Sequence, residues 1–271
     1  MDRRNFLKTG GIALLGSLAT GSAMALTTPG ALGGEGADKK AAVALAMNHF
    51  GVSEADLKKV LAAALEKGGD YADLFFEHTI SNSIRLMDGA VNNSYSNIDY
   101  GVGVRVLTGD QSGYAYVENI TVEDMLKAAR TAARIASANK GNKPLNLTEK
   151  ELKKNYYTVA SPWEEVSLKD KMPYLQKLND RIFALDKRVH KVQASQSDTT
   201  SHIFFCNSEG VMFYDYRPMV TLGAVCIMEE DGKTENGYAA RAYRRGFDFL
   251  SDEVVDVIAR EAVDQTSLLF K

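Results

Sequence analysis

The stretch from Tyr100 to Val117 alternates between two kinds of residue, and this alternation constrains the fold more than any other feature of the chain. Valines hold one set of positions and glycine or arginine the other: Val102, Val104 and Val106 against Gly101, Gly103 and Arg105. A period of two is typical of a β-strand with one apolar face. The polar residues around Gly109 predict a turn, and the stretch 114–117 predicts a returning strand. The sequence therefore predicts a β-hairpin and a sheet-containing fold.

The two glycines of this hairpin point to the same face of the predicted strand. A glycine inside a strand often marks the close approach of another backbone, a helix or a ligand. One interpretation is that the sheet packs there against a helix. The other is a groove in which an extended peptide lies against bare backbone. The residues leave both open, so Gly101, Gly103 and Arg105 are candidate contacts for a peptide or a partner protein.

The first 25 residues have the three-part layout of an export signal. Arg3 and Arg4 precede a short apolar run over residues 10–18, and a small-residue cleavage site ends at Ala25. Paired arginines in this context are typical of the twin-arginine route, so we expect a periplasmic protein after cleavage. The apolar run is too short to span a membrane, and no stable membrane anchor is expected. Residues 26–39 predict a flexible tether.

Charge argues against one class of partner, and the two cysteines allow a prediction about disulfides. The 271 residues carry a net charge of −3 and no long basic run, so we expect no nucleic-acid partner. Cys206 and Cys226 both lie among apolar, strand-like residues, which predicts two buried free thiols. A disulfide between them is the alternative that an oxidising compartment would permit.

The order of predicted elements repeats along the chain. The first unit covers residues 40–140, a connector covers 141–165, and the second unit covers 166–271. Each unit is predicted as a helix, five strands and a helix. The predicted strands cover residues 72–79, 83–87, 90–97, 100–106 and 114–117, then 189–195, 201–207, 211–217, 219–228 and 234–242. Ser53, Thr121, Ser167 or Asp170, and Ser251 are the predicted helix N-caps.

Matching landmarks suggest that the two units are duplicates. Gly89 and Gly103 in the first unit correspond to Gly210 and Gly223 in the second, and residues 113–115 correspond to 237–239. The pattern predicts an internally duplicated α+β fold with mainly antiparallel or mixed sheets and helices on one face. Coincidence is the alternative, because hairpins share turn residues. Arg105 has no counterpart, since Val225 takes its aligned place.

Motifs for catalysis are missing from the sequence. None of the four histidines, His49, His78, His190 and His202, stands in a zinc-protease spacing, and each is interpreted as a surface or hydrogen-bonded residue. There is no Gly-x-Ser-x-Gly elbow, dinucleotide fingerprint or Walker spacing. The cluster of Arg241, Arg244 and Arg245 is interpreted as a solvated strand end, with contact to an anion as the alternative.

Several segments together resemble the N-terminal half of the TldD/PmbA family, known as modulators of DNA gyrase. They are Gly69-Asp70-Tyr71-Ala72-Asp73-Leu74, Asp88-Gly89, residues 100–106, Gly113-Tyr114-Ala115, residues 121–136 and Ser161-Pro162-Trp163. The resemblance implies a zinc metalloprotease that acts on unfolded peptides, as a homodimer or with a paralogous subunit. The family's zinc motif, His-Glu-x-x-x-His, does not occur in these 271 residues. No catalytic or metal-binding residue is therefore assigned, and we expect no cofactor in this chain.

Two hypotheses follow. The first is that the chain is the N-terminal domain of an exported zinc peptidase, whose metal-bearing C-terminal half lies outside it. The second is that it works as a non-catalytic, peptide-binding or partner subunit of a dimeric protease, with the glycine hairpin as the contact. For the isolated chain we expect neither stoichiometric zinc nor peptidase activity.

Overall fold

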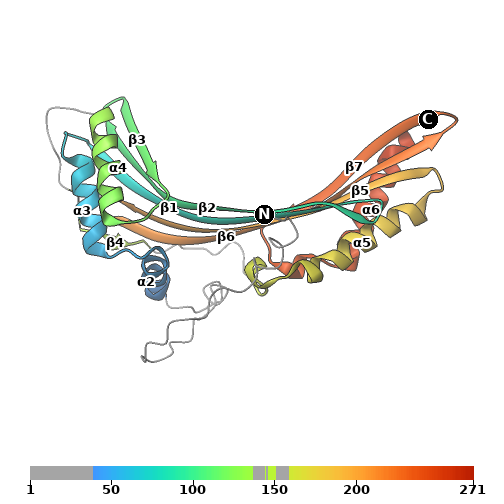
Figure 1. Cartoon of the computed structure of the whole chain (residues 1–271), viewed down its shortest axis with the longest axis horizontal. Helices are drawn as coiled ribbons and strands as arrows, with labels where there is room; N and C mark the ends of the chain where they lie inside the picture. Colours follow the sequence, from blue (N-terminus) through green and yellow to red (C-terminus); the bar gives the residue numbers. More distant parts are fainter. Residues whose placement is uncertain (1–38, 137–143, 145, 151–158) are drawn as a thin grey trace, which may run out of the picture.

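The structure, a computed structural model, describes residues 39–136, 144, 146–150 and 159–271. The predicted signal peptide with Arg3, Arg4 and Ala25, residues 26–38 of the tether and parts of the connector lie outside the described residues. The described part is an α+β fold, as predicted. Figure 1 shows one long, bent sheet with a pair of helices on its convex side at each end. None of the described helices is long and apolar enough to cross a membrane.

The sheet has seven strands in the described residues. They are β1 (Tyr71–Met87), β2 (Ala90–Thr108), β3 (Gln111–Val117), β4 (Thr148–Glu149), β5 (Val189–Asn207), β6 (Val211–Glu230) and β7 (Lys233–Tyr243). The order is β3-β2-β1-β5-β6, with β7 and β4 both pairing with β6. All pairs are antiparallel except the short parallel contact of β4 with β6. Pairing of β1 with β5 joins the two units into a single sheet.

Each unit has three strands, two of them 17 to 20 residues long, where the sequence predicted five short ones, so the predicted strand count is wrong. Polar residues interpreted as breaks lie inside continuous strands, because their side chains have partners across the sheet. Asn82 donates to Asp198 over 2.9 Å, and the hydroxyls of Ser81 and Thr199 lie 3.4 Å apart. The actual turns between strands fall where the backbone has positive φ: Asp88-Gly89, Gly109, Gly210 and Asp231-Gly232.

Five helices with described bounds accompany the sheet: α2 (Lys39–Phe50), α3 (Glu54–Leu65), α4 (Val122–Ile135), α5 (Leu168–Leu185) and α6 (Asp252–Leu268). Two 3-10 turns add to them, η2 (Trp163–Glu165) and η3 (Phe247–Phe249). The N-cap predictions at Ser53, Thr121 and Ser251 are confirmed, and Ser167 rather than Asp170 caps α5. Local sequence therefore determines where these four helices begin.

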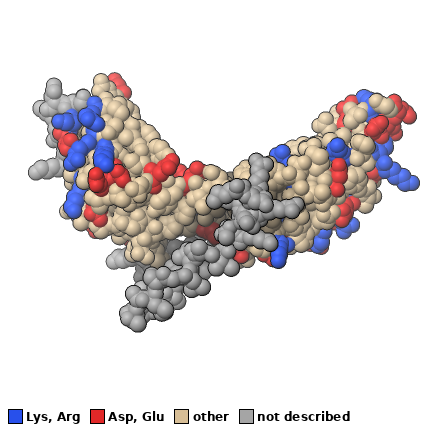
Figure 2. Space-filling view, in the orientation of Figure 1, with Lys and Arg blue, Asp and Glu red and all other residues tan. Residues whose placement is uncertain are grey.

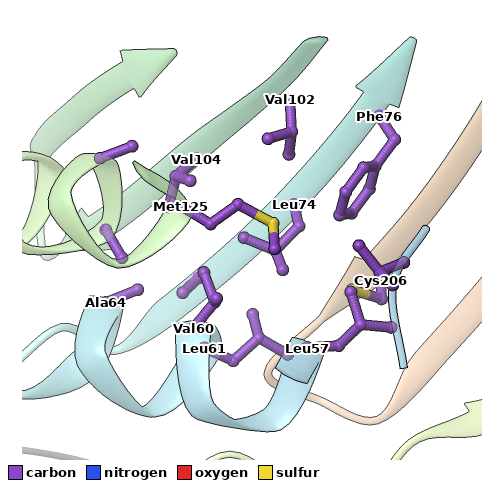
Figure 3. Close-up of a cluster of buried hydrophobic side chains, with 14 of the residues drawn as sticks. Leu57, Val60, Leu61, Ala64, Leu74, Phe76, Val102, Val104, Met125 and Cys206 are labelled. Carbon is purple, nitrogen blue, oxygen red and sulfur yellow. The ribbon is translucent and has the colours of Figure 1, made fainter. Parts of the chain in front are cut away.

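Two hydrophobic cores lie on the same face of the sheet. At one end, Leu74 and Phe76 of β1 pack with α3 and α4, as Figure 3 shows around Leu57, Leu61 and Met125. At the other end, Ile84 and Leu86 of β1 pack with α5 and α6. These four positions of β1 are all even-numbered, so they share one face of the strand. The prediction of helices on one face is confirmed.

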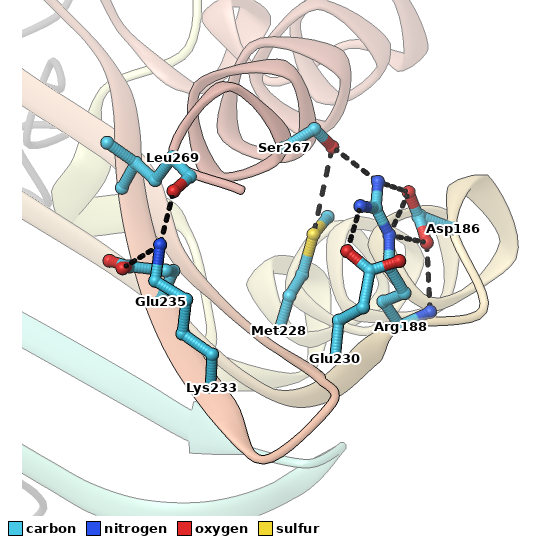
Figure 4. A network of polar contacts seen from close by, with 8 residues as sticks. All are labelled: Asp186, Arg188, Met228, Glu230, Lys233, Glu235, Ser267 and Leu269. Atoms are coloured by element: carbon cyan, nitrogen blue, oxygen red, sulfur yellow. Dashed lines mark hydrogen bonds and ion pairs between the residues drawn. The ribbon is translucent and has the colours of Figure 1, made fainter. Parts of the chain in front are cut away.

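Helix α6 ends without a glycine at its C-terminus, and charged side chains on or next to the neighbouring strands hold this end in place. Lys233, the first residue of β7, donates to the carbonyl of Leu269 over 2.7 Å and forms an ion pair with Glu235 (Figure 4). Nearby, Arg188 contacts Asp186 at 2.7 Å, Glu230 at 3.0 Å and Ser267 at 3.3 Å. These contacts tie the end of α6 to the strands beneath it, and a cation at a helix C-terminus also complements the helix dipole.

The two units correspond closely in structure. Gly113 of β3 and Gly237 of β7 each lie directly under a helix: a β-carbon at Gly113 would meet the carbonyl of Ala132 in α4, and one at Gly237 would meet Thr266 in α6. The register also pairs Arg105 with Tyr114 and Val225 with Tyr238, so Val225 does occupy the place of Arg105. Each unit runs helix, three strands, helix, which supports the predicted internal duplication.

Cys206 and Cys226 are both buried and free, as predicted. Each belongs to a different core, Cys206 to the one under α3 and α4 and Cys226 to the one under α5 and α6. Burial raises the pKa of both thiols, which keeps them protonated and unreactive near neutral pH.

Candidate functional site

The predicted contact residues lie on the open face of the sheet, opposite the helices. Gly101 and Gly103 are both buried. A β-carbon at Gly101 would lie 2.5 Å from the carbonyl oxygen of Val117, and one at Gly103 would lie 2.5 Å from the hydroxyl of Tyr114. The chain's own β3 strand therefore fills the space above both glycines. Contact with a peptide at this hairpin stays a prediction.

Arg105, the third predicted residue, forms an ion pair on the same face. Its Nη2 lies 2.6 Å and its Nε 2.9 Å from the same carboxylate oxygen of Asp73 on β1. Asp73 is almost fully buried, whereas about half of the Arg105 side chain is exposed. The hydrogen bond to Asp73 raises the pKa of Arg105. The outer part of this guanidinium remains open to solvent.

A cluster of three histidines forms near the middle of the sheet, on the helix-bearing face. We call His49, His78 and His202 the histidine cluster. Nε2 of His49 lies 2.8 Å from Nδ1 of His78, and the ring of His49 stacks on that of His202 with centroids 4.9 Å apart. The interpretation of these three histidines as surface or hydrogen-bonded residues is confirmed, but the sequence did not show that they meet. His190 lies apart, exposed near the start of β5.

Strand register brings two of these histidines together. His78 of β1 is the direct cross-strand partner of His202 of β5. Residues paired in this way share a face and lie side by side. Nothing local in the sequence reveals this pairing, because it depends on the register of strands that are far apart in the chain. The sequence offered one signal: His78 and His202 each lie on the same face of their strand as the neighbouring buried apolar residues.

His202 is the buried anchor of the cluster. Its Nε2 lies 2.7 Å from a carboxylate oxygen of Glu164 in η2, and its Nδ1 lies 2.7 Å from the hydroxyl of Tyr214 in β6. An ionised carboxylate only accepts, so Nε2 of His202 donates to Glu164. Tyr216 donates to the second oxygen of Glu164 over 2.9 Å. Both ring nitrogens of His202 are therefore occupied.

Burial and mutual repulsion keep the outer two rings of the cluster neutral. Burial, with the neighbouring His202 and His78, lowers the pKa of His49 to about 4. Burial and His202 also lower the pKa of His78. Although burial alone would raise the pKa of Glu164, hydrogen bonds from His202 and Tyr216 lower it. At neutral pH the cluster thus combines uncharged outer rings with one carboxylate.

A buried ion pair continues the polar region along β5. Nζ of Lys171 in α5 lies 2.6 Å from Asp198, and both side chains are at least 96% buried, with exposed fractions of 4% and 1%. Asn82 and Gln196 also donate to Asp198. Gln196, Asp198 and His202 thus form a polar segment of β5 between the two hydrophobic cores. Sequence analysis did not single out Lys171 or Asp198.

The histidine cluster does not have the geometry of a zinc site. Two nitrogens bound tetrahedrally to one zinc at about 2.0–2.1 Å lie roughly 3.3 Å apart. The facing nitrogens of His49 and His78 are closer, at 2.8 Å, and both nitrogens of His202 are taken. Among the residues that the structure describes, no group of three or more His, Cys, Asp or Glu side chains is arranged to hold a metal ion. We therefore derive no catalytic step through zinc from these residues.

Acidic and basic side chains are interspersed over the helices at both ends of the molecule, as Figure 2 shows for one face. No large field of a single charge sign covers the visible part of that face. This distribution is typical of an ordinary solvated protein surface.

Two family models match consecutive parts of the chain. The model for the PmbA/TldA metallopeptidase domain 1 matches residues 72–136, and the model for the PmbA/TldA metallopeptidase central domain matches residues 161–270. The first range covers β1 to α4 and the second covers η2 to α6. The matched segments therefore coincide with the two halves of the fold.

Curated relatives agree with these matches. A metalloprotease TldD homolog of Haemophilus influenzae is 32% identical over 206 residues, which covers 72% of this chain and 42% of the relative. A TldD homolog of Buchnera aphidicola subsp. Acyrthosiphon pisum is 26% identical, covering 76% of this chain and 43% of the relative. The chain thus spans less than half the length of these relatives.

Solved structures show the same fold. A protein described as a modulator of DNA gyrase from Thermotoga maritima matches with a TM-score of 0.62 and 19% identity, over 79% of this chain and 47% of that one. TldE from Thermococcus kodakarensis matches with a TM-score of 0.60 and 16% identity, over 78% of this chain and 47% of that one. At these identities the likeness concerns the fold alone.

The duplicated α+β fold and the two matched segments define domains of a metallopeptidase family. The chain belongs to the PmbA/TldD family and carries its first and central domains.

Proposed function

We propose that this chain provides the first and central domains of an exported, zinc-dependent metallopeptidase that acts on unfolded peptides. The observation that carries the proposal is the match of both domain models, in order, to the two halves of the fold. The relatives named as metalloproteases are more than twice as long as the matched region. We assign the zinc to protein outside the described residues, since these do not fit a zinc site.

The proposed assembly is a homodimer or a pair with a paralogous subunit. A similar structure carries the name TldE and relatives carry the name TldD, which supports pairing between related chains. In such an assembly, this chain would position and enclose the peptide while the metal-bearing part hydrolyses it.

Zinc content and peptide cleavage test the proposal. The product of the complete reading frame that contains these residues and the 271-residue chain alone are purified in parallel. Elemental analysis and cleavage of an unfolded, fluorescently labelled peptide are then measured on both. We expect about one zinc per chain and cleavage for the complete product and neither for the 271-residue chain. A complete product without zinc or cleavage would contradict the proposal, as would one zinc per chain in the 271-residue form.

Export is tested separately. Replacing both Arg3 and Arg4 by lysine keeps the charge but removes the paired arginines. We expect the wild-type protein in the periplasmic fraction and the double variant in the cytoplasmic fraction. Lys8→Arg is the matched control and should be exported. Equal periplasmic amounts of wild type and double variant would exclude the twin-arginine route.

One observation favours a second candidate, a non-catalytic peptide-binding subunit. β2 pairs with β1 along its whole length but with β3 only from Val102 onward. In the described part of the chain, residues 90–101 of β2 therefore form a sheet edge without a neighbouring strand. Such an edge can accept an extended peptide as an added strand. Stoichiometric peptide binding by a complete product that contains no zinc would support this candidate over the first.

A further inference from the structure

Helix α2 is a short element that packs on the sheet next to the α3 and α4 end, as part of the same hydrophobic core (Figure 1). Its residues Val43, Ala46 and Phe50 are buried against the sheet. The ring of Phe50 lies 5.4 Å from that of Phe76, and 6.4 Å from that of Phe204. Three residues join α2 to α3, and one of them, Gly51, has a φ of +67°. The link is therefore short and turns sharply, while the contacts of α2 are with the sheet.

The last turn of α2 places His49 on the other two histidines. His49 is exposed on its outer side, while its Nε2 faces Nδ1 of His78. This contact needs one donor and one acceptor, so the two rings share a single N–H between the facing nitrogens. When both rings carry a second proton, each facing nitrogen is a donor and the hydrogen bond is lost.

Side chains from five elements surround the histidine cluster. His78 comes from β1, His202 from β5, Tyr100 from β2, Tyr214 and Tyr216 from β6, and Glu164 from η2. Both oxygens of Glu164 are already bound, one by His202 and one by Tyr216. Glu164 therefore bonds directly to His202, and its charge offsets only part of the lowering of the pKa of His49 and His78.

We propose that α2 is an acid-released strap: protonation of the histidine cluster frees the helix from the sheet and uncovers the aromatic surface of Phe76, Phe204 and Tyr100. At neutral pH the uncharged rings of His49 and His78 share a hydrogen bond that holds the last turn of α2 in place. At acidic pH two or three positive charges would lie within one small cluster, with one carboxylate to offset them.

The difference in the pKa of His49 between the docked and released states sets the direction in which pH changes the docking of α2. The docked state holds the pKa of His49 near 4, whereas a histidine free in solvent titrates near 6.5. Below about pH 6.5 the released state therefore binds more protons, and the docked state is weakened progressively as the pH falls toward 4. Because solvent at the exposed edge of His49 screens part of this effect, we expect docking to weaken about tenfold between pH 8 and pH 5.

Hydrogen exchange on the full 271-residue chain tests this proposal. Protection factors are measured for the amides of residues 43–50 at pH 8 and pH 5, each corrected for the intrinsic exchange rate at that pH. The amides of α3 are the internal reference. We expect protection of α2 to fall about tenfold at pH 5 while protection of α3 is unchanged. Equal α2 protection at both pH values, or a parallel loss in α3, would overturn the proposal.

Two variants separate histidine protonation from general acid effects. His49→Phe keeps an aromatic ring on the sheet but cannot be protonated, so α2 should keep its protection at pH 5. His78→Phe removes the partner of His49 on the sheet. It replaces the first variant in the test if circular dichroism shows that His49→Phe does not fold. His190→Phe, on an exposed histidine outside the cluster, should behave like the wild type. If both cluster variants lost as much protection of α2 at pH 5 as the wild type does, the role of the histidines would be refuted.

Discussion

The phenol of Tyr114 covers Gly103, and the phenol of Tyr238 lies over Gly223 together with Ala239 and Ala240. A β-carbon at Gly103 would lie 2.5 Å from the Tyr114 hydroxyl oxygen, and one at Gly223 would lie 3.1 Å from that of Tyr238. The repeated relationship shows that these glycines serve packing within each unit. Gly113 differs from these two glycines, because the backbone of helix α4 lies directly over it.

The two kinds of glycine should respond differently to alanine. In Gly113→Ala the added methyl group meets the Ala132 carbonyl, a backbone group that cannot move without displacing α4. We expect a loss of about 2–3 kcal/mol in the free energy of unfolding. In Gly103→Ala the obstacle is the end of a 60% exposed tyrosine, which can swing into solvent, so we expect less than about 1 kcal/mol. Urea denaturation of both variants measures the difference, and equal losses would contradict this account.

Removing one partner of the Lys171–Asp198 pair should be costly. Lys171→Met leaves the Asp198 carboxylate buried with only Asn82 and Gln196 as donors. We expect a loss of about 3–5 kcal/mol, and a smaller loss for the double variant Lys171→Met with Asp198→Asn. Lys177→Met, at a solvent-exposed ion pair on the same helix, is the control and should cost less than about 1 kcal/mol. If the double variant were as unstable as the single one, the pair would not be the source of the effect.

Arg105→Ala distinguishes a structural role from a binding role. The substitution leaves the buried Asp73 carboxylate without its ion-pair partner, so we expect a loss of about 1–3 kcal/mol in stability. Asp73→Asn in the same chain should recover part of it. Fluorescence anisotropy with a labelled unfolded peptide then measures binding by the folded double variant. Unchanged affinity would remove Arg105 from the candidate contacts.

Glu164 should contribute to stability above its ordinary titration range. Its folded-state pKa is lowered by hydrogen bonds from His202 and Tyr216, so its contribution is present above about pH 4.5 and is lost as the pH falls below that value. Between pH 5 and pH 3.5, we expect the free energy of unfolding to fall more steeply for the wild type than for Glu164→Gln. Glu165→Gln, at the exposed neighbouring position, should follow the wild-type curve.

The sequence predicted the features that depend on neighbouring residues. Helix starts at Ser53, Thr121 and Ser251 could be predicted because a capping side chain bonds to a backbone amide three residues away. Alternation predicted the apolar face of β2, with Val102 and Val104 buried under the helices. These interactions are local, and so is the information that specifies them.

Features that depend on strand register could not be predicted. Asn82 seemed to interrupt a strand until Asp198, 116 residues away in sequence, supplied its hydrogen-bond partner. The meeting of His78 with His202 depends on the same β1–β5 register. The long strands and the histidine cluster thus share one cause, a pairing between the two units that no short pattern contains.

That central pairing also has a consequence for biosynthesis. When β1 and β2 leave the ribosome, the second edge of β1 has no neighbour until β5 has been made, more than a hundred residues later. A long open strand edge at this stage can pair with another nascent chain, and sheets built from distant segments fold slowly. The growing chain therefore has its period of greatest aggregation risk between synthesis of the two units, and a chaperone that shields β1 during that interval would raise the yield of folded protein.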